Sequence, residues 1–128
     1  MTTNYPFDSL DDSAIVYRAL LRRQWIDETS AIVSFSAYLL RPNEPGLSVT
    51  IASVCSPEQC AAKFQNCYGV ASLQVGQIRE LGLDAIPDSD SHAQIFGLPY
   101  VKDDRDRAER LADLLAERSR IVWTPSQT

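Results

Sequence analysis

The sequence predicts a single α+β domain with a mostly antiparallel central sheet. Short segments rich in β-branched and aromatic residues recur along the chain between turn-forming residues, as strands of such a sheet do. Two other segments carry helix start and stop signals, one in mid-chain and one near the C-terminus. A length of 128 residues suits one domain with its own hydrophobic core. Residues 1–12, rich in Asp, Ser and Thr, are expected to form a flexible lead-in to a domain at 13–128.

The first strand is expected at 14–21, where β-branched and aromatic residues cluster in the sequence AIVYRALL. Side chains alternate between the two faces of a strand. One face then carries Ile15, Tyr17 and Ala19, and the other carries Val16, Arg18 and Leu20. The alternative is a helix over 13–25 capped by Ser13, because short apolar runs occur in both kinds of structure.

Further strands are expected in the middle of the chain. An extended segment is predicted at 31–40, with a break near 34–36, and strands are predicted at 47–52 and 70–75. The segment 41–46 contains two prolines and a glycine, so we expect a loop there.

The mid-chain helix is expected at about 57–67. Ser56 is a suitable N-terminal cap, Pro57 suits the first helical position, and Gln59 is placed for a capping box. Gly69 is expected to end the helix. The side chains expected to be buried are Cys60, Ala61, Phe64 and Cys67.

The C-terminal third is predicted to contain a short helical turn at 77–81 ended by Gly82, then two short strands at 83–86 and 92–97 around the loop 87–91. A helix is expected at about 104–119, because acidic residues occur at its start and basic residues at its end. Its apolar stripe is Ala108, Leu111, Ala112, Leu114 and Leu115. Residues 120–123 form either a last strand or a docked tail.

The charge balance argues against a binder of duplex nucleic acid. The chain has 12 Lys and Arg against 17 Asp and Glu, a net charge of −5, and such binders normally present a basic face. A local patch remains open, since Arg18, Arg22 and Arg23 are close in sequence. No apolar run is long enough for a membrane span, and the polar N-terminus does not resemble a signal peptide. We therefore expect a cytoplasmic protein with no membrane partner.

The three cysteines do not predict a metal site. Cys55, Cys60 and Cys67 have the spacings C-x4-C and C-x6-C, which differ from zinc knuckles, and free cysteine is often a buried core residue. The single histidine, His92, follows the acidic loop PDSDS and begins a strand. It is a candidate acid or base for catalysis. The alternative is a surface histidine that is hydrogen-bonded to its own loop.

Arg18 is the most specific candidate for binding. An arginine inside an otherwise apolar strand needs an anionic partner, because burying an unpaired guanidinium costs several kcal/mol. That partner is either an internal carboxylate or a phosphate-bearing ligand, since arginine binds both in a bidentate manner.

The order of these motifs resembles that of small bacterial ADP-ribosyltransferase-like toxins and the related RES-type NAD-degrading domains. The motifs are Tyr17-Arg18 on the first strand, Gly46-Leu47-Ser48 at the head of a central strand, the following helix and strand 69–75, and the turn 75–78. The resemblance implies NAD as the ligand. Arg18 would contact its phosphate or ribose, Ser48 would position the ribose, and Tyr17 or Tyr38 would stack on the nicotinamide.

The sequence departs from this family at the late strand, where His92 and Gln94 stand in place of the family's glutamate. The resemblance therefore implies either a binding-only member or a carboxylate supplied from elsewhere, by Glu44, Glu80 or Glu109. Of these residues, His92 and Glu80 are the candidates for catalysis.

A different class of function is the alternative. A small acidic domain without a strong motif also suits a non-catalytic protein–protein interaction or regulatory module. Its partner would bind through Tyr5, Phe7, Trp25 or the segment 96–101, where aromatic and apolar residues meet a proline.

Overall fold

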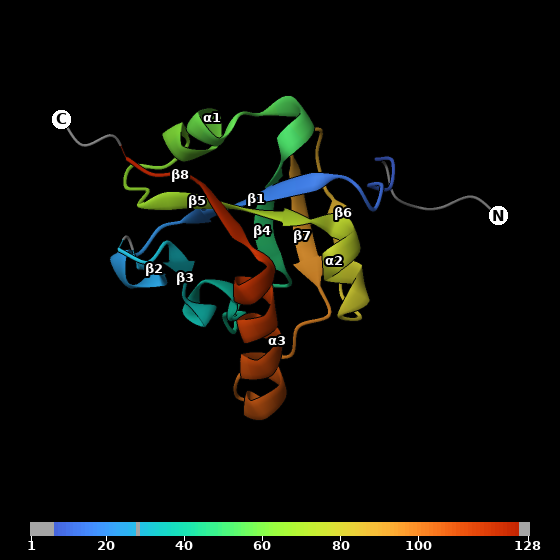
Figure 1. The fold of residues 1–128 in the computed structure, drawn as a ribbon. Helices are drawn as coiled ribbons and strands as arrows, with labels where there is room; N and C mark the ends of the chain where they lie inside the picture. The colour runs from blue at the N-terminus through green and yellow to red at the C-terminus, as the bar shows by residue number, and fades with distance from the viewer. Residues whose placement is uncertain (1–6, 28, 126–128) are drawn as a thin grey trace.

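The computed structural model describes residues 7–27 and 29–125. They fold around a six-stranded sheet with the strand order β6-β7-β4-β1-β5-β8 (Figure 1). Every neighbouring pair of strands is antiparallel. The strands are β1 (Ile15–Leu20), β4 (Leu47–Ile51), β5 (Gly69–Gln74), β6 (Asp84–Pro87), β7 (His92–Phe96) and β8 (Arg120–Trp123). The predicted α+β class with a mostly antiparallel sheet is confirmed.

The segment after β1 is less extended than the sequence predicts. A separate two-stranded sheet joins β2 (Ile26–Asp27) to β3 (Ile32–Val33), and 3-10 helices occupy η1 (Arg23–Trp25), η2 (Phe35–Tyr38) and η3 (Ala52–Val54). The predicted break near 34–36 is confirmed, but the chain does not become extended again directly after it, because η2 continues to Tyr38. The Ser34 hydroxyl accepts a hydrogen bond from the Ser36 N–H (3.2 Å), and this cap starts η2.

Helix α1 (Pro57–Ala62) begins as predicted and ends early. Its capping box is formed: Gln59 N donates to Ser56 Oγ (3.1 Å), and Ser56 N donates to Gln59 Oε1 (2.9 Å). The expected extension to residue 67 is wrong, because Tyr68 N donates to the Leu20 carbonyl (2.8 Å) and draws the chain into the sheet. Gly69 therefore starts β5 rather than ending the helix. Phe64 lies beyond the helix and is 39% exposed, so its predicted burial is also wrong.

Two further helices follow. Helix α2 (Val75–Glu80) continues directly from β5, and Gly82, with a φ of 81°, turns the chain after it. Helix α3 (Arg105–Arg118) starts where the Asp104 carboxylate accepts from Arg107 N (3.1 Å). Within the described ranges, no helix has the length and apolar character needed to cross a membrane. The last segment is a strand rather than a docked tail, since β8 pairs with β5.

The sheet is covered on both faces (Figure 1). Helix α3 and η2 pack on one face, which contains the larger core cluster, including Val16, Leu20, Ala37, Tyr38, Leu73, Leu111 and Leu115. Helix α1 packs on the other face with Ala19, Cys55, Cys60, Ala61 and Val70. The buried stripe of α3 consists of Ala108, Leu111, Ala112, Leu115 and Ala116. Leu114, which was expected in this stripe, is only half-buried.

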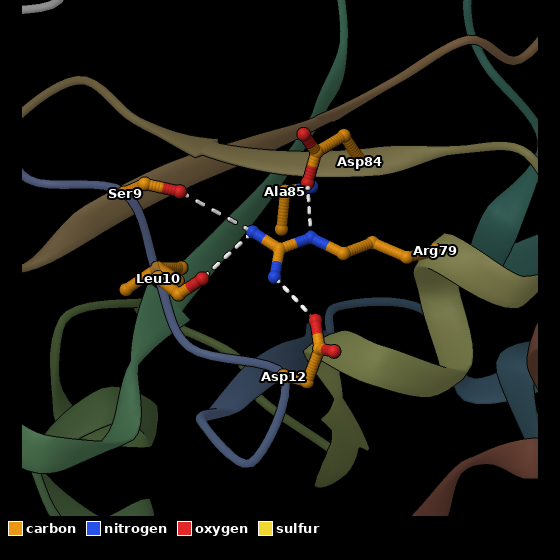
Figure 2. A network of polar contacts seen from close by, with 6 residues as sticks. All are labelled: Ser9, Leu10, Asp12, Arg79, Asp84 and Ala85. Atoms are coloured by element: carbon orange, nitrogen blue, oxygen red, sulfur yellow. Dashed lines mark hydrogen bonds and ion pairs between the residues drawn. The ribbon is translucent and has the colours of Figure 1, made fainter.

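The residues before β1 are held against α2 by Arg79 (Figure 2). Its guanidinium binds the carboxylates of Asp12 (2.6 Å) and Asp84 (2.9 Å) and donates to the Leu10 carbonyl (2.7 Å). The hydrogen bonds that Arg79 donates to both carboxylates raise its pKa. Residues 9–12 of the expected flexible lead-in thus contact the domain, and residues 1–6 lie outside the described residues.

We expect Leu115→Ala to lower the free energy of unfolding by about 2–5 kcal/mol, because it empties a site that is 0% exposed beneath α3. Leu114→Ala is the matched control in the same helix and should cost about 1 kcal/mol or less, since Leu114 is half-buried. Urea denaturation of both variants measures the difference. Equal losses would contradict this assignment of the buried face.

Candidate functional site

The site lies where the central pair of strands separates. Strand β1 pairs with β5 at six positions, from Ile15 to Leu20, but with β4 only at Val16 and Tyr17. After Tyr17 the two strands no longer pair. The Ser48 carbonyl of β4 accepts a hydrogen bond from the Arg18 side chain instead, through Nη1 (3.0 Å). An opening between β1 and β4 is the result.

Arg18 is buried without a carboxylate partner. It is 9% exposed, and its Nε donates to the Ala37 carbonyl in η2 (3.0 Å). Within residues 7–27 and 29–125, no carboxylate forms an ion pair with it. Burial lowers the pKa of Arg18, while Tyr38 and Glu44 partly offset this effect. Because an arginine stays protonated at neutral pH, a positive charge without an ion-pair partner among the described residues lines the opening.

Three arginines surround the Trp25 ring at the end of η1. The guanidinium carbon of Arg18 lies 5.4 Å from the ring centre, and those of Arg22 and Arg41 each lie 5.9 Å from it. These are cation–π distances. Three guanidinium groups thus cluster around one indole ring, although the net charge of the chain is −5.

A cavity of about 190 Å³ opens at this place. Its charged lining consists of Arg18, Arg41 and Glu44, with His92 beside them. The remaining lining residues are aromatic, apolar or hydroxyl-bearing: Tyr17, Ala19, Leu21, Trp25, Ser48, Val49, Thr50 and Phe64. The Glu44 carboxylate accepts a hydrogen bond from Arg41 N (3.1 Å), which fixes the loop on this side of the cavity.

Polar side chains on a single face of the sheet form another wall of this cavity. Tyr17 pairs with Thr50, and Thr50 pairs with His92, so the three side chains lie in a row across β1, β4 and β7. Ser48 lies two residues before Thr50 and therefore shares its face. Four residues predicted from the sequence, Tyr17, Arg18, Ser48 and His92, thus line the same cavity.

His92 is held by a carboxylate. Its Nδ1 lies 2.6 Å from Asp88 Oδ1, and Gln94 Nε2 donates to Asp88 Oδ2 (3.0 Å). Partial burial acts to raise the pKa of Asp88, but the hydrogen bonds from Gln94 and His92 outweigh it and lower this pKa. With Nδ1 engaged, Nε2 is the ring nitrogen left for a ligand, as in other carboxylate–histidine pairs. The bond to the loop is the one expected of a surface histidine, yet His92 also lines the cavity.

The other candidates are placed differently. Glu80 lies on α2, where it pairs with Arg118 (3.1 Å), and it does not line this cavity. Glu109 lies on α3 and pairs with Arg105 (3.0 Å). Of the three alternative carboxylates, only Glu44 reaches the cavity.

The prediction that Tyr38 could stack on a nicotinamide is wrong, because this side chain is 0% exposed beneath α3. Its hydroxyl has no hydrogen-bond partner among the described residues. Burial raises the pKa of Tyr38 to about 12, and the positive charge of Arg18 opposes the rise.

Cys55 and Cys60 belong to the smaller core cluster, and the half-buried Cys67 packs against it. Cys60 Sγ donates to Thr50 Oγ1 (3.5 Å), and Cys67 Sγ donates to the Gly69 carbonyl (3.1 Å). Burial raises the pKa of both thiols, which disfavours the thiolate. The described part of the chain contains no group of three or more His, Cys, Asp or Glu side chains that could hold a metal ion.

Sequence reasoning missed Trp25, Arg41 and Asp88 as parts of the site. Trp25 suits core packing equally well, and it is indeed 6% exposed. Arg41 and Asp88 belong to loops whose positions depend on tertiary structure. The only signal for Asp88 was its location in the acidic loop before His92.

No protein-family model matches this chain, and neither a curated protein nor a solved structure matches it. The resemblance to ADP-ribosyltransferase-like domains therefore remains a prediction that rests on the residues.

Asp88→Asn should destabilise the protein at pH 7 more than at pH 3. The lowered pKa of Asp88 means that its carboxylate stabilises the folded state above its ordinary pKa of 3.8, and this contribution is lost as the pH falls through the lower folded value. Urea midpoints of the wild type and the variant at both pH values measure the effect. If the urea midpoints of the two proteins differ by the same amount at both pH values, the stabilising role of the Asp88 carboxylate is contradicted.

Proposed function

We propose that this domain binds a phosphate-bearing nucleotide of the NAD class in the cavity between β1 and β4. The observation that carries the proposal is Arg18, a buried guanidinium that donates to the carbonyls of Ala37 and Ser48 and has no carboxylate partner in the described residues. An internal ion pair was the alternative, and Arg18 forms none there. A phosphate supplies the missing anion in the geometry that arginine prefers.

The rest of the lining suits a nucleotide better than a free inorganic anion. The rings of Tyr17 and Phe64 offer surfaces to a flat base, and Ser48 offers a hydroxyl to a ribose. Ligand sites combine such apolar walls with a few polar groups that fix the orientation. NAD is the specific ligand that the family resemblance implies.

His92 is the group in this cavity that can move a proton. Asp88 holds Nδ1, which leaves Nε2 to donate a proton to a leaving group or to accept one from a water molecule. Glu44 is the carboxylate on the opposite side, although it also caps its own loop through Arg41 N. The site is thus built first for binding, with one acid–base group at its edge.

Calorimetric titration of NAD tests the binding. Arg41→Ala should weaken binding by about tenfold or more, since it removes a charged donor that lies on the surface and contributes little to folding. Arg18→Lys, which keeps the charge but loses the planar donors, should weaken it further. Arg120→Ala, at the far edge of the sheet, is the control for the loss of one positive charge.

Saturable binding that is unchanged in Arg41→Ala and Arg18→Lys would place the nucleotide elsewhere. No heat at millimolar NAD would overturn the proposal. The alternative of a protein-binding module would then gain weight, although Trp25 is too deeply buried to serve as its contact surface.

If NAD is consumed, His92→Ala should lower the turnover by about 10²–10⁴-fold, which is the usual contribution of a general acid or base. Glu80→Gln should leave turnover unchanged, because Glu80 pairs with Arg118 away from the cavity. Chromatography of the reaction products measures both rates. A loss of turnover in Glu80→Gln with none in His92→Ala would reverse the assignment.

A further inference from the structure

A second cavity adjoins the first. It has a volume of about 330 Å³ and shares two of its walls, Trp25 and Arg41, with the first cavity. Arg22 and Lys102 add positive charge on its far side. Apolar and neutral polar residues complete the lining: Gln24, Ser36, Leu39, Leu40, Pro42, Tyr100 and Val101.

The rim of this second cavity is held in place. The Tyr100 hydroxyl donates to the Glu44 carbonyl (2.8 Å), which links the turn before α3 to the loop that carries Arg41. Asp103 N donates to the Tyr100 carbonyl (3.0 Å) and closes the turn around Lys102. Arg22 and Lys102 are thus presented from two segments that the hydrogen bonds and the packing on Trp25 keep near Arg41.

The distribution of charge over the two cavities is far from even. They are lined by four of the 12 Lys and Arg residues, namely Arg18, Arg22, Arg41 and Lys102, but by only one of the 17 Asp and Glu residues, Glu44. The second cavity has no acidic residue in its lining. An acidic chain that gathers its cations in this way focuses a positive field at one place.

Some cations outside the two cavities are paired with carboxylates of the protein. Arg79, Arg105 and Arg118 each have a carboxylate oxygen within 3.1 Å. None of the four cavity cations forms such an ion pair with any residue in 7–27 or 29–125. Among the described residues, Glu44 is thus the one acidic residue that lines either cavity, and it forms no ion pair with the four cations.

We propose that the second cavity is a separate phosphate-binding subsite, formed by Arg22 and Lys102 where this cavity adjoins Trp25 and Arg41. This inference rests on the proposed function in one respect only, namely that the ligand of the first cavity is a nucleotide. The phosphate of the second cavity is either a further phosphate of that nucleotide or belongs to a second phosphorylated molecule. The two sources share one chemistry, a phosphate dianion bound by charged donors.

Counting the sites for inorganic pyrophosphate tests the subsite by itself. We expect calorimetry to find two sites in the wild type, one of which is lost in the double variant Arg22→Ala/Lys102→Ala and the other in Arg18→Lys. Both residues of the double variant are exposed, so the fold should persist, as circular dichroism can verify. Arg120→Ala is again the control for charge and should retain both sites.

The outcomes separate the two proposals. A single site that is lost in Arg18→Lys and kept in the double variant would overturn the second subsite and leave the proposed function standing. A single site that is lost only in the double variant would support the second subsite and count against binding at Arg18. The absence of any binding would overturn both.

A matched pair of ligands then identifies the source of the phosphate. NADP differs from NAD by one phosphate, so a further phosphate on the same ligand predicts that the wild type binds NADP about tenfold more tightly or better, and that the double variant loses this preference. A second molecule predicts instead that pyrophosphate still binds to the NAD-saturated protein through Arg22 and Lys102. Equal affinity for NAD and NADP together with no pyrophosphate binding to the saturated protein would overturn the subsite.

Discussion

The guanidinium of Arg18 is the interaction on which the site depends. It occupies the point where the β1–β4 ladder ends, and its bonds to the carbonyls of Ala37 and Ser48 join β1, η2 and β4. Stability alone does not account for an arginine at this position. An apolar side chain of similar volume is often neutral or stabilising where a charge is buried, and a buried charge without an anion costs several kcal/mol. The anionic ligand that we propose would remove that cost, so that binding and folding would favour the same arrangement.

Much of the fold could be predicted because its signals are local. The alternation in β1 correctly placed Arg18 on the same face as Val16 and Leu20, and the capping box correctly located the start of α1. The end of α1 could not be predicted, since it is set by the hydrogen bond from Tyr68 to Leu20, whose partners are far apart in sequence. Ser34 shows a further limit: the sequence predicts a break near this residue, but not the 3-10 helix Phe35–Tyr38 that its hydroxyl caps.

The candidate site was predictable as individual residues but not as a cavity. Tyr17, Arg18, Ser48 and His92 each stood out by type and position, and pairing between β1, β4 and β7 places three of them on one face. The cavity itself exists because β1 and β4 pair over only two positions, and nothing in a single sequence indicates where a ladder stops. Trp25 and Arg41 enter the site as a consequence of that separation.

The contrast between the net charge and the site bears on the size of the ligand. Exposed charges are screened over about 8 Å at physiological ionic strength, so a small anion inside the cavities interacts chiefly with the nearby arginines. A long polyanion would also meet the acidic surface of a chain with a net charge of −5. Low-dielectric walls such as Trp25 strengthen the attraction for the small ligand, because they focus the field of the cations. The arrangement is therefore consistent with the compact phosphorylated ligand that we propose, and the sequence-based prediction that the chain does not bind duplex nucleic acid rests on the same charge balance.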